Sequence, residues 1–411
     1  MRVAINAQMQ ETGTWGGIEQ FIIGLVHALG RLDDGPEEYV IVVHRRNAHW
    51  LNDYLGRNQQ TVCMPLSKFE RAKRLLGPLR TPTGKLWLYA QQRIIAPQVP
   101  ESNGFYESLG VNVVHFPYQF FAKCDVPFVY NPHDLQHLHY PDFFTPQERA
   151  IRNAFYPAGC RYANAVATLS RWAKEDIVRQ YDVVPQKVYA IPCGAPTETY
   201  GSITPKLLAD AAKKFRLPQL FSFYPAQTWE HKNHVRLLKA LAGLRDRDSL
   251  VANLVCSGKQ NDYWRSIEKR IHELKLQNQV QFLGFVKPDE LRALYHLAQF
   301  VIHPSLFEGG GLPVLEAFRE GVPVACSNVT ALPECAGDAA LLFDPRDVES
   351  IADTVRRMAT DAGLRGELRR RGSERIRLFT WERTAKMYRA LYRQVAGVPL
   401  SEEDSALLAE A

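Results

Sequence analysis

The sequence predicts an α/β protein of two tandem domains, each with a parallel sheet covered by helices. The chain has 411 residues, and at about 150 residues per domain this length corresponds to two or three domains. Hydrophobic residues make up 46% and charged residues 23% of the chain, which is typical of a globular protein that can bury a core. Short apolar runs alternate with amphipathic stretches of helix length along the chain. Strands separated by helices form βαβ units, so we expect parallel sheets with helices on both faces.

The first half of the chain contains the elements of one such domain. Its expected strands are short apolar runs at residues 2–6, 39–43, 111–115, 128–130, 165–168 and 187–192. Its expected helices are the amphipathic stretches 18–29, 147–162 and 171–179. These elements place the first domain at residues 1–195.

A segment rich in turn-forming residues then interrupts the alternation. Proline and glycine recur between Pro192 and Pro205, which is typical of a connection between domains. We place this linker at residues 196–217. The halves on either side of it share no sequence repeat that we detect.

The alternation resumes after Pro218 and defines a second domain at residues 218–378. Its expected strands are 219–224, 250–256, 280–283, 299–303 and 323–326. Its expected helices are 235–244, 263–274, 288–297 and 312–319, followed by terminal helices from 348 onward. Residues 379–411 are expected to form a last helix and a tail. In such open sheets ligands bind beyond the carboxyl ends of the strands, so the cleft between the two domains is the expected active site.

Composition excludes several classes of protein. No window reaches 18 uncharged apolar residues, so no membrane-spanning helix is expected. The N-terminus lacks the apolar core of a signal peptide. The seven cysteines form no Cys-x-x-Cys pair, which favours reduced thiols in a cytoplasmic protein over disulfides or structural zinc. The net charge of +6 is too small to indicate a nucleic-acid partner.

One basic stretch departs from the pattern. Residues 66–93 contain seven Lys or Arg and a single acid, Glu70. Two interpretations explain this excess of basic residues equally well. One is a solvated helical excursion, and the other is a surface for an anionic acceptor or an anionic membrane. A membrane contact would place the protein peripherally at the inner face.

Three common catalytic motifs are absent. Neither Gly84-Lys85 nor Gly258-Lys259 is followed by the hydroxyl residue of a Walker loop. The glycine loop after the first strand, at residues 13–17, is not the G-x-G-x-x-G of dinucleotide dehydrogenases. No G-x-S-x-G elbow of an α/β-hydrolase is present.

The most informative segment runs from His303 to Phe318. An expected strand leads into a loop with three consecutive glycines, and a helix begins near Leu312. Glycines allow a close approach of the backbone to a ligand, and free N–H groups at a helix start suit a phosphate or sugar oxygen. Glu308 in the loop and Glu316 one turn into the helix can accept hydrogen bonds from two points of one polyhydroxylated ligand. The alternative is an ordinary helix start with one favourable and one exposed acid.

This segment resembles the E-x7-E signature of glycosyltransferase family 4, a group of retaining enzymes that use nucleotide sugars. Further landmarks follow in the order of that family. They are Gly16-Gly17-Ile18-Glu19, His133-Asp134, Thr168-Leu-Ser170-Arg171, Ile191-Pro-Cys-Gly194, His231-Lys232-Asn233, Phe282-Leu-Gly284-Phe-Val and Leu332-Pro-Glu334. The resemblance implies a GT-B fold: two Rossmann-like domains with parallel sheets facing across a cleft, the acceptor side first and the donor side second. It also implies that the last helix, about residues 381–392, crosses back to the first domain.

The resemblance assigns roles to four side chains. Lys232 is expected to neutralise the diphosphate as the glycosidic bond breaks, and Glu308 to bind the donor sugar near its 3-hydroxyl. His133 is expected to contact the sugar near its 6-hydroxyl, and Glu316 to hold the ribose hydroxyls. Stabilising a dianionic leaving group in a low-dielectric cleft is the largest electrostatic contribution expected there.

The other expected contacts surround the nucleotide. Gly16 and Gly17 would offer backbone N–H groups at a helix start to the distal phosphate. The remaining donor-binding candidates are Ser257, Gly258, Lys259, Phe285, Gly309, Gly310, Gly311 and Leu312. The resemblance implies a nucleoside-diphosphate sugar as the donor and a glycan or a lipid-linked glycan as the acceptor. The resemblance implies no obligatory cofactor and no metal.

The sequence lacks one basic residue that is common in the family. Many family members carry an arginine five or six residues before the lysine, whereas Ala226 and Gln227 occupy these positions here. His231 or Lys259 could supply the second cation on the diphosphate instead.

A cluster of histidines follows the expected strand at residues 128–130. His133, His137 and His139 with Asp134 could ligate a divalent ion, but such clusters are often incidental, so only His133 is taken as functional.

The sequence therefore predicts transfer of a hexose-type sugar to a hydroxyl group. A nucleotide-sugar epimerase of the same fold is one alternative, because it would bind the same donor. A catalytically silent nucleotide-sugar-binding scaffold is another, and the missing arginine supports it. Polysaccharide or glycolipid assembly, with mannosyl or glucosyl transfer, is the setting that the resemblance implies.

Overall fold

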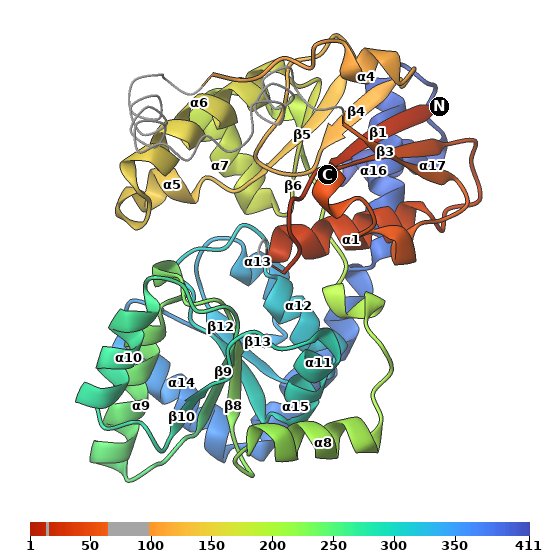
Figure 1. Ribbon diagram of the computed structural model, residues 1–411. Coiled ribbons are helices and arrows are strands. Elements are labelled where there is room, and N and C mark those ends of the chain that lie inside the picture. Colours follow the sequence, from red (N-terminus) through yellow and green to blue (C-terminus); the bar gives the residue numbers. More distant parts are fainter. Residues whose placement is uncertain (14–15, 65–97) are drawn as a thin grey trace, which may run out of the picture.

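Two parallel sheets organise the chain into two domains, stacked one above the other in Figure 1. The computed structural model describes residues 1–13, 16–64 and 98–411. The predicted basic stretch 66–93 therefore lies outside the described residues. No helix among the described residues is long and apolar enough to cross a membrane.

The N-terminal sheet contains seven strands among the described residues, all parallel. In spatial order they are β3 (Gln59–Cys63), β2 (Glu38–Val43), β1 (Arg2–Ala7), β4 (Val113–Phe116), β5 (Phe128–His133), β6 (Ala165–Thr168) and β7 (Val188–Ala190). The helices of this region are α1 (Gly17–Leu29), α4 (Phe105–Ser108), α5 (Gln136–His139), α6 (Pro146–Tyr162) and α7 (Arg171–Tyr181). The strands predicted from apolar runs are all present, and β3 was not predicted.

The second sheet contains six parallel strands within the described part of the chain. In spatial order they are β10 (Val280–Phe282), β9 (Leu254–Ser257), β8 (Ser222–Pro225), β11 (Phe300–His303), β12 (Val324–Ser327) and β13 (Ala340–Phe343). Its helices are α9 (His234–Asp248), α10 (Trp264–Glu273), α11 (Pro288–Leu297), α12 (Leu312–Arg319), α13 (Leu332–Ala336), α14 (Val348–Thr360) and α15 (Ala362–Arg375). Strand β13 was not predicted.

The segment between the domains is partly helical. Residues 196–217, predicted as a linker, contain the 3-10 helix η5 (Pro196–Thr199) and the helix α8 (Pro205–Phe215). Helix α8 packs against α11 of the second domain, and Figure 1 shows it below the second sheet.

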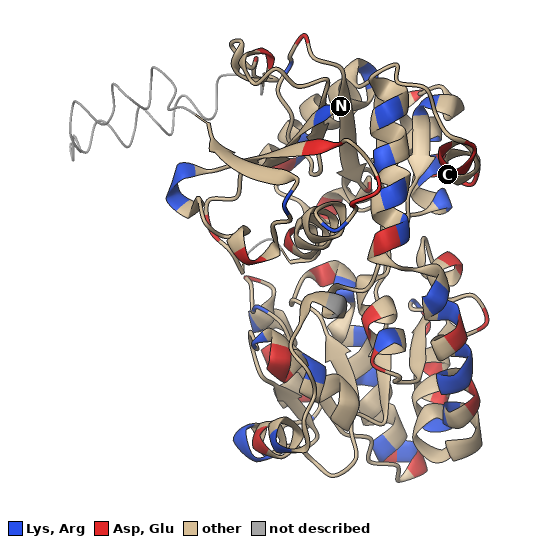
Figure 2. Cartoon of the chain, turned by 90° about the vertical axis from the view of Figure 1, so that its right-hand side faces the viewer, with Lys and Arg blue, Asp and Glu red and all other residues tan. Residues whose placement is uncertain are grey.

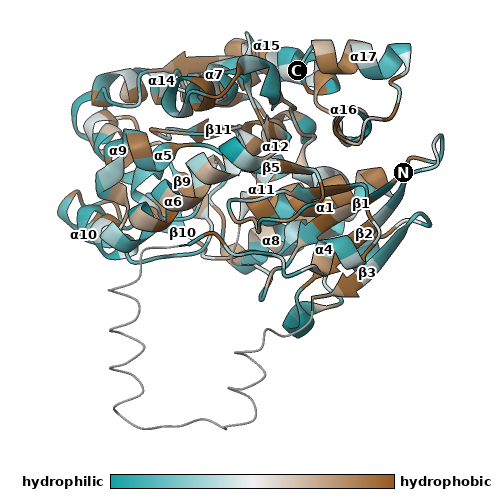
Figure 3. Ribbon diagram, turned by 90° about the horizontal axis from the view of Figure 1, so that it is seen from above, coloured by the Kyte–Doolittle hydropathy of each residue, from teal (hydrophilic) through white to brown (hydrophobic). Residues whose placement is uncertain are grey.

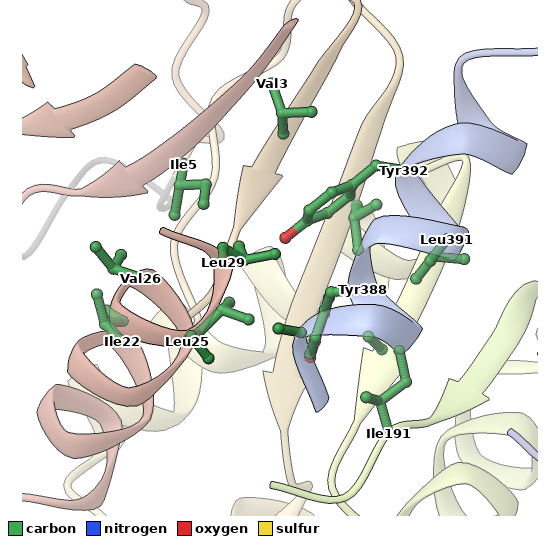
Figure 4. Close-up of a cluster of buried hydrophobic side chains, with 14 of the residues drawn as sticks. Val3, Ile5, Ile22, Leu25, Val26, Leu29, Ile191, Tyr388, Leu391 and Tyr392 are labelled. Atoms are coloured by element: carbon green, nitrogen blue, oxygen red, sulfur yellow. The ribbon is translucent and has the colours of Figure 1, made fainter. Parts of the chain in front are cut away.

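The C-terminal helices α16 (Trp381–Val395) and α17 (Glu402–Ala409) belong spatially to the N-terminal domain. Helix α16 packs against α1, and the apolar side chains of both join β1 in one core, which Figure 4 shows around Ile5, Leu25 and Tyr388. The indole of Trp381 donates a hydrogen bond of 3.0 Å to the carbonyl of Ala195. The chain thus crosses between the domains twice.

A buried polar network fixes α16 against the N-terminal sheet. The imidazole of His115 bonds to Asn131 at 3.1 Å and to the hydroxyl of Tyr392 at 2.8 Å, and Asn131 donates to the hydroxyl of Tyr388 at 2.7 Å. Burial lowers the pKa of His115 to about 3. Each of these polar groups has a partner, so the network specifies one docking position for the helix.

The surface carries charges of both signs. Lys and Arg are interspersed with Asp and Glu over both domains in Figure 2. Seen from above, the outer helices carry hydrophilic and hydrophobic residues on different faces (Figure 3), as expected for helices that cover a sheet.

Candidate functional site

A cleft of about 1030 Å³ separates the carboxyl ends of the two sheets and is lined by both domains. Its volume lies at the upper end of the range for small-molecule sites, roughly 300–1,000 Å³. All the sequence-predicted site residues line it, namely Gly16, Gly17, His133, Lys232, Ser257, Gly258, Lys259, Phe285, Glu308, Gly309, Gly310, Gly311, Leu312 and Glu316. The structure therefore brings together every candidate from both halves of the chain.

Lys232 and Glu308 form an ion pair in this cleft. Their Nζ and Oε1 atoms are 2.6 Å apart, and the same oxygen accepts a hydrogen bond of 2.9 Å from Nε2 of His303. Burial favours the neutral form of Glu308, but the ammonium of Lys232 and the His303 hydrogen bond outweigh it and hold the Glu308 pKa well below 4.5. Glu308 is therefore ionised and Lys232 is compensated.

The backbone around Lys232 is held on several sides. Lys232 ends the 3-10 helix η6 (Glu230–Lys232) that follows strand β8, and its carbonyl accepts a hydrogen bond of 2.7 Å from Tyr224. The next residue, Asn233, has φ of 61° and donates to the carbonyls of Pro304 and Pro345 at 2.9 and 2.8 Å. This bracing fixes where the lysine enters the cleft.

Glu316 has a different environment. It lies in the second turn of α12, is 7% exposed, and accepts a hydrogen bond of 2.5 Å from the hydroxyl of Tyr295 on α11. Burial raises its pKa to about 7, against the Tyr295 hydrogen bond and with a smaller repulsion from Glu320. No lysine or arginine of the described residues lies within 4 Å of this carboxylate. The two glutamates of the signature thus differ in ionisation.

His133 contributes to the cleft from the N-terminal domain. It ends strand β5 with φ of 65°, a left-handed conformation that is uncommon for a residue with a side chain. Its Nε2 lies 2.8 Å from the carbonyl oxygen of Pro117. Since a carbonyl only accepts, Nε2 carries the proton and Nδ1 is the acceptor of the ring. Burial lowers the pKa of His133 to about 4, so the ring is neutral.

The glycine loop permits the two domains to approach. A Cβ on Gly309 would lie 2.9 Å from the Cβ of Asp134 and 2.9 Å from the carbonyl oxygen of His133. The carbonyl of Gly309 accepts a hydrogen bond of 2.9 Å from Ser170, which caps α7. Gly309 therefore serves contact between the domains as well as access to a ligand.

The N-terminal glycine loop faces the second domain. Gly16 has φ of 56°, which favours glycine, and a Cβ there would lie 3.0 Å from the side-chain nitrogen of Gln227. Gly17 opens α1 and lies close to Leu312. The start of α1 thus lies beside the loop that precedes Lys232.

Of the two sequence candidates for a second cation on the diphosphate, His231 and Lys259, only Lys259 remains. Burial, with the nearby charge of Lys232, lowers the pKa of His231 to about 3, so its ring is neutral at pH 7. Lys259 lines the cleft with an exposed side chain. Phe285 is 67% exposed on the same rim.

The histidines after His133 do not join it in a cluster. His137 packs edge-on against the ring of Tyr156, with centroids 4.9 Å apart, and His139 bonds to Asp176 at 2.8 Å. Among residues 1–13, 16–64 and 98–411, no group of three or more His, Cys, Asp or Glu side chains is arranged to hold a metal ion.

Some site residues were not assigned from the sequence. Tyr295 is separated from Glu316 by a strand and a loop, and no local pattern marks it. Glu334 belongs to a quoted landmark, and its carboxylate accepts the backbone N–H groups of Arg171 and Trp172 at 2.9 and 3.1 Å, which joins α13 to the start of α7 across the domains. Arg152 of α6 also lines the cleft.

Two family models match the chain in succession. The model described as Glycosyltransferase Family 4 matches residues 15–199, and the model described as Glycosyl transferases group 1 matches residues 209–377. The chain belongs to glycosyltransferase family 4. The resemblance inferred from the glutamate signature is thereby confirmed.

Curated relatives of this family 4 chain include bacterial mannosyltransferases. The O-antigen chain mannosyltransferase B of Escherichia coli is 30% identical over 225 residues, which cover 54% of this chain and 58% of the relative. The O-antigen chain mannosyltransferase RfbU of Salmonella typhimurium is 27% identical over 224 residues, with coverage of 54% and 58%. Each match thus spans little more than half of the relative's length.

Solved structures match almost the whole family 4 chain. Sucrose-phosphate synthase from Thermosynechococcus elongatus has a TM-score of 0.70 at 21% identity, with 97% of this chain and 99% of that chain covered. The Anabaena protein HepE, solved with UDP and glucose, has a TM-score of 0.69 at 16% identity, with coverage of 96% and 100%. These similarities confirm the predicted GT-B fold.

Proposed function

We propose that this protein transfers a hexosyl unit, of the mannosyl type, from a nucleoside-diphosphate sugar to a hydroxyl acceptor with retention of configuration. The observation that carries the proposal is the segment 308–316, which presents two carboxylates of different ionisation in a cleft between the domains, Glu308 paired with Lys232 and Glu316 buried without a cationic partner among the described residues. The mannosyltransferase relatives support the choice of sugar. Polysaccharide or glycolipid assembly, with a lipid-linked acceptor, is the proposed setting.

The proposed donor position follows from the chemistry of the lining groups. Glu316 accepts hydrogen bonds from the ribose hydroxyls, which favour its ionised form over the protonated one. Glu308 accepts from the sugar near its 3-hydroxyl, and the neutral ring of His133 contacts the sugar near its 6-hydroxyl. Lys232 and the N–H groups after Gly16 meet the diphosphate.

The proposed reaction breaks the bond between the sugar C1 and the diphosphate oxygen and forms a bond from C1 to the acceptor oxygen on the same face. The acceptor proton passes to the departing phosphate oxygen, so the products are a glycoside and a nucleoside diphosphate. Lys232 exchanges part of its contact with Glu308 for the leaving group as negative charge develops. Lys259 is the proposed second cation in place of the missing arginine.

The experiment has two stages. Thermal shift with UDP-, GDP-, ADP- and dTDP-sugars, each with and without EDTA, identifies the donor, because a ligand at a hundred times its Kd adds about 2.7 kcal/mol. We expect one nucleotide to stabilise the protein equally with EDTA. Release of free nucleotide is then measured with mannosyl acceptors, and NMR of the product gives the anomeric configuration.

The outcomes separate the proposal from its alternatives. Nucleotide release that depends on acceptor, with an α-linked product from an α-linked donor, supports transfer. A changed sugar without nucleotide release supports the epimerase. Donor binding without turnover or slow hydrolysis supports a binding scaffold, and loss of activity with EDTA would contradict metal-free transfer.

A further inference from the structure

One face of α6 forms the wall of the cleft opposite the donor residues. Glu148, Ile151, Arg152 and Phe155 line the cleft at positions i, i+3, i+4 and i+7 of this helix. This spacing places them on one stripe of the helix. Phe120, after strand β4, lines the cleft beside Phe155, with their ring centroids 5.4 Å apart. None of these residues has a role in the donor site proposed above.

Arg152 is held in a defined position on this wall. Its guanidinium carbon lies 4.5 Å from the ring centroid of Phe144, and Nη1 donates a hydrogen bond of 2.7 Å to the hydroxyl of Tyr156. Stacking on an aromatic ring and one hydrogen bond restrict the side chain while leaving other N–H groups available.

This arginine has no carboxylate partner within the ranges 1–13, 16–64 and 98–411, where no Asp or Glu oxygen lies within 4 Å of its nitrogens. The nearest acid on its helix face, Glu148, is engaged elsewhere. Its Oε2 accepts from the backbone N–H and the hydroxyl of Thr145, both at 2.8 Å. A half-buried guanidinium without a carboxylate partner suits an anion supplied by a ligand.

Asp134 interacts electrostatically both with Arg152 and with the donor residues. It lines the same cleft, and a Cβ on Gly309 would touch it at 2.9 Å. Burial raises the pKa of Asp134, and the charges of Arg152, Glu308 and Lys232 all act on it. Arg152, Asp134 and Glu308 all line this one cleft, so a ligand bound by Arg152 can extend to the sugar beside Glu308.

We propose that Arg152 binds a phosphate group of the acceptor. Phe120 and Phe155 then pack against an apolar face of the same acceptor. The proposal rests on the proposed function, because it names the substrate class of the second half of the same cleft. The planar guanidinium pairs with phosphate oxygens through two N–H groups, which a lysine cannot reproduce. The phosphate can belong to a soluble sugar phosphate or to a sugar joined to a lipid through diphosphate.

The first experiment measures binding without turnover. Isothermal titration with α-mannose 1-phosphate and with methyl α-mannoside compares the wild type with Arg152→Gln and Arg152→Lys. We expect the wild type to bind the phosphate probe at least about tenfold more tightly than the neutral one, and Arg152→Gln to lose this difference. Arg152→Lys should retain part of it, because the charge remains without the two-point contact.

Two controls locate the phosphate. Arg161→Gln removes an exposed arginine from the last turn of the same helix and should leave the affinity unchanged. Lys232→Met tests the donor end of the cleft. Loss of phosphate binding in Lys232→Met but not in Arg152→Gln would place the phosphate at the donor end and overturn the proposal. Equal affinity in Arg152→Gln and Arg161→Gln would also overturn it.

A second experiment distinguishes the two sources of phosphate. Transfer rates from the nucleotide sugar that stabilises the protein in the thermal-shift screen are measured with α-mannose 1-phosphate and with mannose linked through diphosphate to a farnesyl chain. A lower KM for the farnesyl acceptor that rises about tenfold in Arg152→Gln, with kcat little changed, assigns the lipid-linked source. The same Arg152-dependent rise with the soluble acceptor alone assigns the free sugar phosphate. A fall in kcat on both acceptors with unchanged KM would contradict an acceptor-binding role.

The two proposals can fail separately. If the donor screen finds no nucleotide but the phosphate titration depends on Arg152, the anion subsite stands and the donor assignment fails. If a donor binds and turns over while Arg152→Gln behaves as wild type with every acceptor, the proposed function stands and the anion subsite fails.

Discussion

The two ends of the segment 308–316 present the same type of side chain in opposite electrostatic environments. At Glu308, a lysine and a histidine contact the carboxylate and keep its pKa well below 4.5. At Glu316, the contact is a tyrosine hydroxyl, and burial raises the pKa to about 7. Neighbouring charge decides the first case and desolvation the second. The sequence spacing alone gives no indication of this difference.

The largest effect is expected at the charged end. Lys232→Met should lower turnover about a hundredfold, because a positioned cation stabilises the leaving group only as its charge develops. The substitution also leaves Glu308 without its ammonium partner. Steady-state rates of nucleotide release measure the effect, and the exposed Lys239→Met on α9 is the matched control. Turnover within about threefold of the wild type would transfer the neutralising role to another cation such as Lys259.

The glycines between the two glutamates give the next effect. Gly309→Ala should lower turnover about tenfold, because its Cβ would meet the His133 carbonyl and the Asp134 Cβ at 2.9 Å and displace one domain from the other. Gly310→Ala is the matched comparison, since its shortest contact, at 2.9 Å, would be with Cδ1 at the end of the Leu169 side chain, which can move, and the Leu169 Cβ would lie at 3.3 Å. We expect Gly310→Ala to lose about twofold or less. Equal rates for the two variants would mean that domain approach at Gly309 is not required.

The uncharged end should make donor binding depend on pH. Below pH 7 the carboxyl of Glu316 is increasingly protonated and cannot accept from both ribose hydroxyls, so the donor Kd should rise, by up to about tenfold per pH unit. Calorimetry of the nucleotide sugar between pH 6 and 8 measures this dependence. The nucleotide sugar is the suitable ligand because its diphosphate does not titrate in this range. Glu316→Gln should bind weakly at every pH, and a persistent pH dependence in that variant would assign it to another group.

The same raised pKa has a consequence for stability. The folded state binds the Glu316 proton more tightly than the unfolded state, so its stabilising contribution is present below pH 4.5 and is lost as pH rises through about 7. Chemical denaturation at pH 6 and 8 should therefore show a smaller decrease in the free energy of unfolding for Glu316→Gln than for the wild type. An identical decrease would mean that Glu316 is ionised throughout.

The smallest effect is expected from the partner of Glu316. The Tyr295 hydroxyl favours the ionised carboxylate, so Tyr295→Phe should raise the Glu316 pKa further. The midpoint of the pH profile should then move upward, with donor affinity a few-fold weaker at pH 7. Tyr162→Phe, at an exposed tyrosine, is the control. A profile unchanged in Tyr295→Phe would mean that the hydrogen bond does not set the ionisation of Glu316.

Much of the fold could be predicted because the interior strands are short apolar runs. Ala165–Thr168 and the helices Pro288–Leu297 and Leu312–Arg319 have the predicted bounds. The two strands that were not predicted lie at sheet edges. Gln59–Cys63 is polar and partly exposed, so its composition marks it only weakly as a strand. Ala340–Phe343 reads Ala-Leu-Leu-Phe, an apolar run like those of the interior strands, so this strand was detectable from the sequence.

Part of the candidate site could also be predicted from the sequence, and part could not. Lys232 and Glu308 follow strands, and Glu316 lies in the second turn of the helix after the Glu308 loop. These positions converge at the carboxyl edge of a parallel sheet, so their proximity could be predicted. The pairing of Glu316 with Tyr295 depends on how α11 packs beside α12, which local sequence does not determine. Arg152 was detectable in principle, because residues 148, 151, 152 and 155 have the spacing of one helix face. Only the tertiary structure shows that this face lines the cleft.

The proposed function depends first on the binding of the nucleotide sugar by the segment 308–316 and Lys232. The most direct measurement is the calorimetric Kd of the nucleotide sugar from the donor screen at pH 8, for the wild type, Glu316→Gln and Lys239→Met. We predict that Glu316→Gln weakens binding at least about tenfold, since an ionised acceptor of two hydroxyls is lost, and that Lys239→Met does not. Equal affinity in all three proteins would contradict the assignment of this cleft as the donor site.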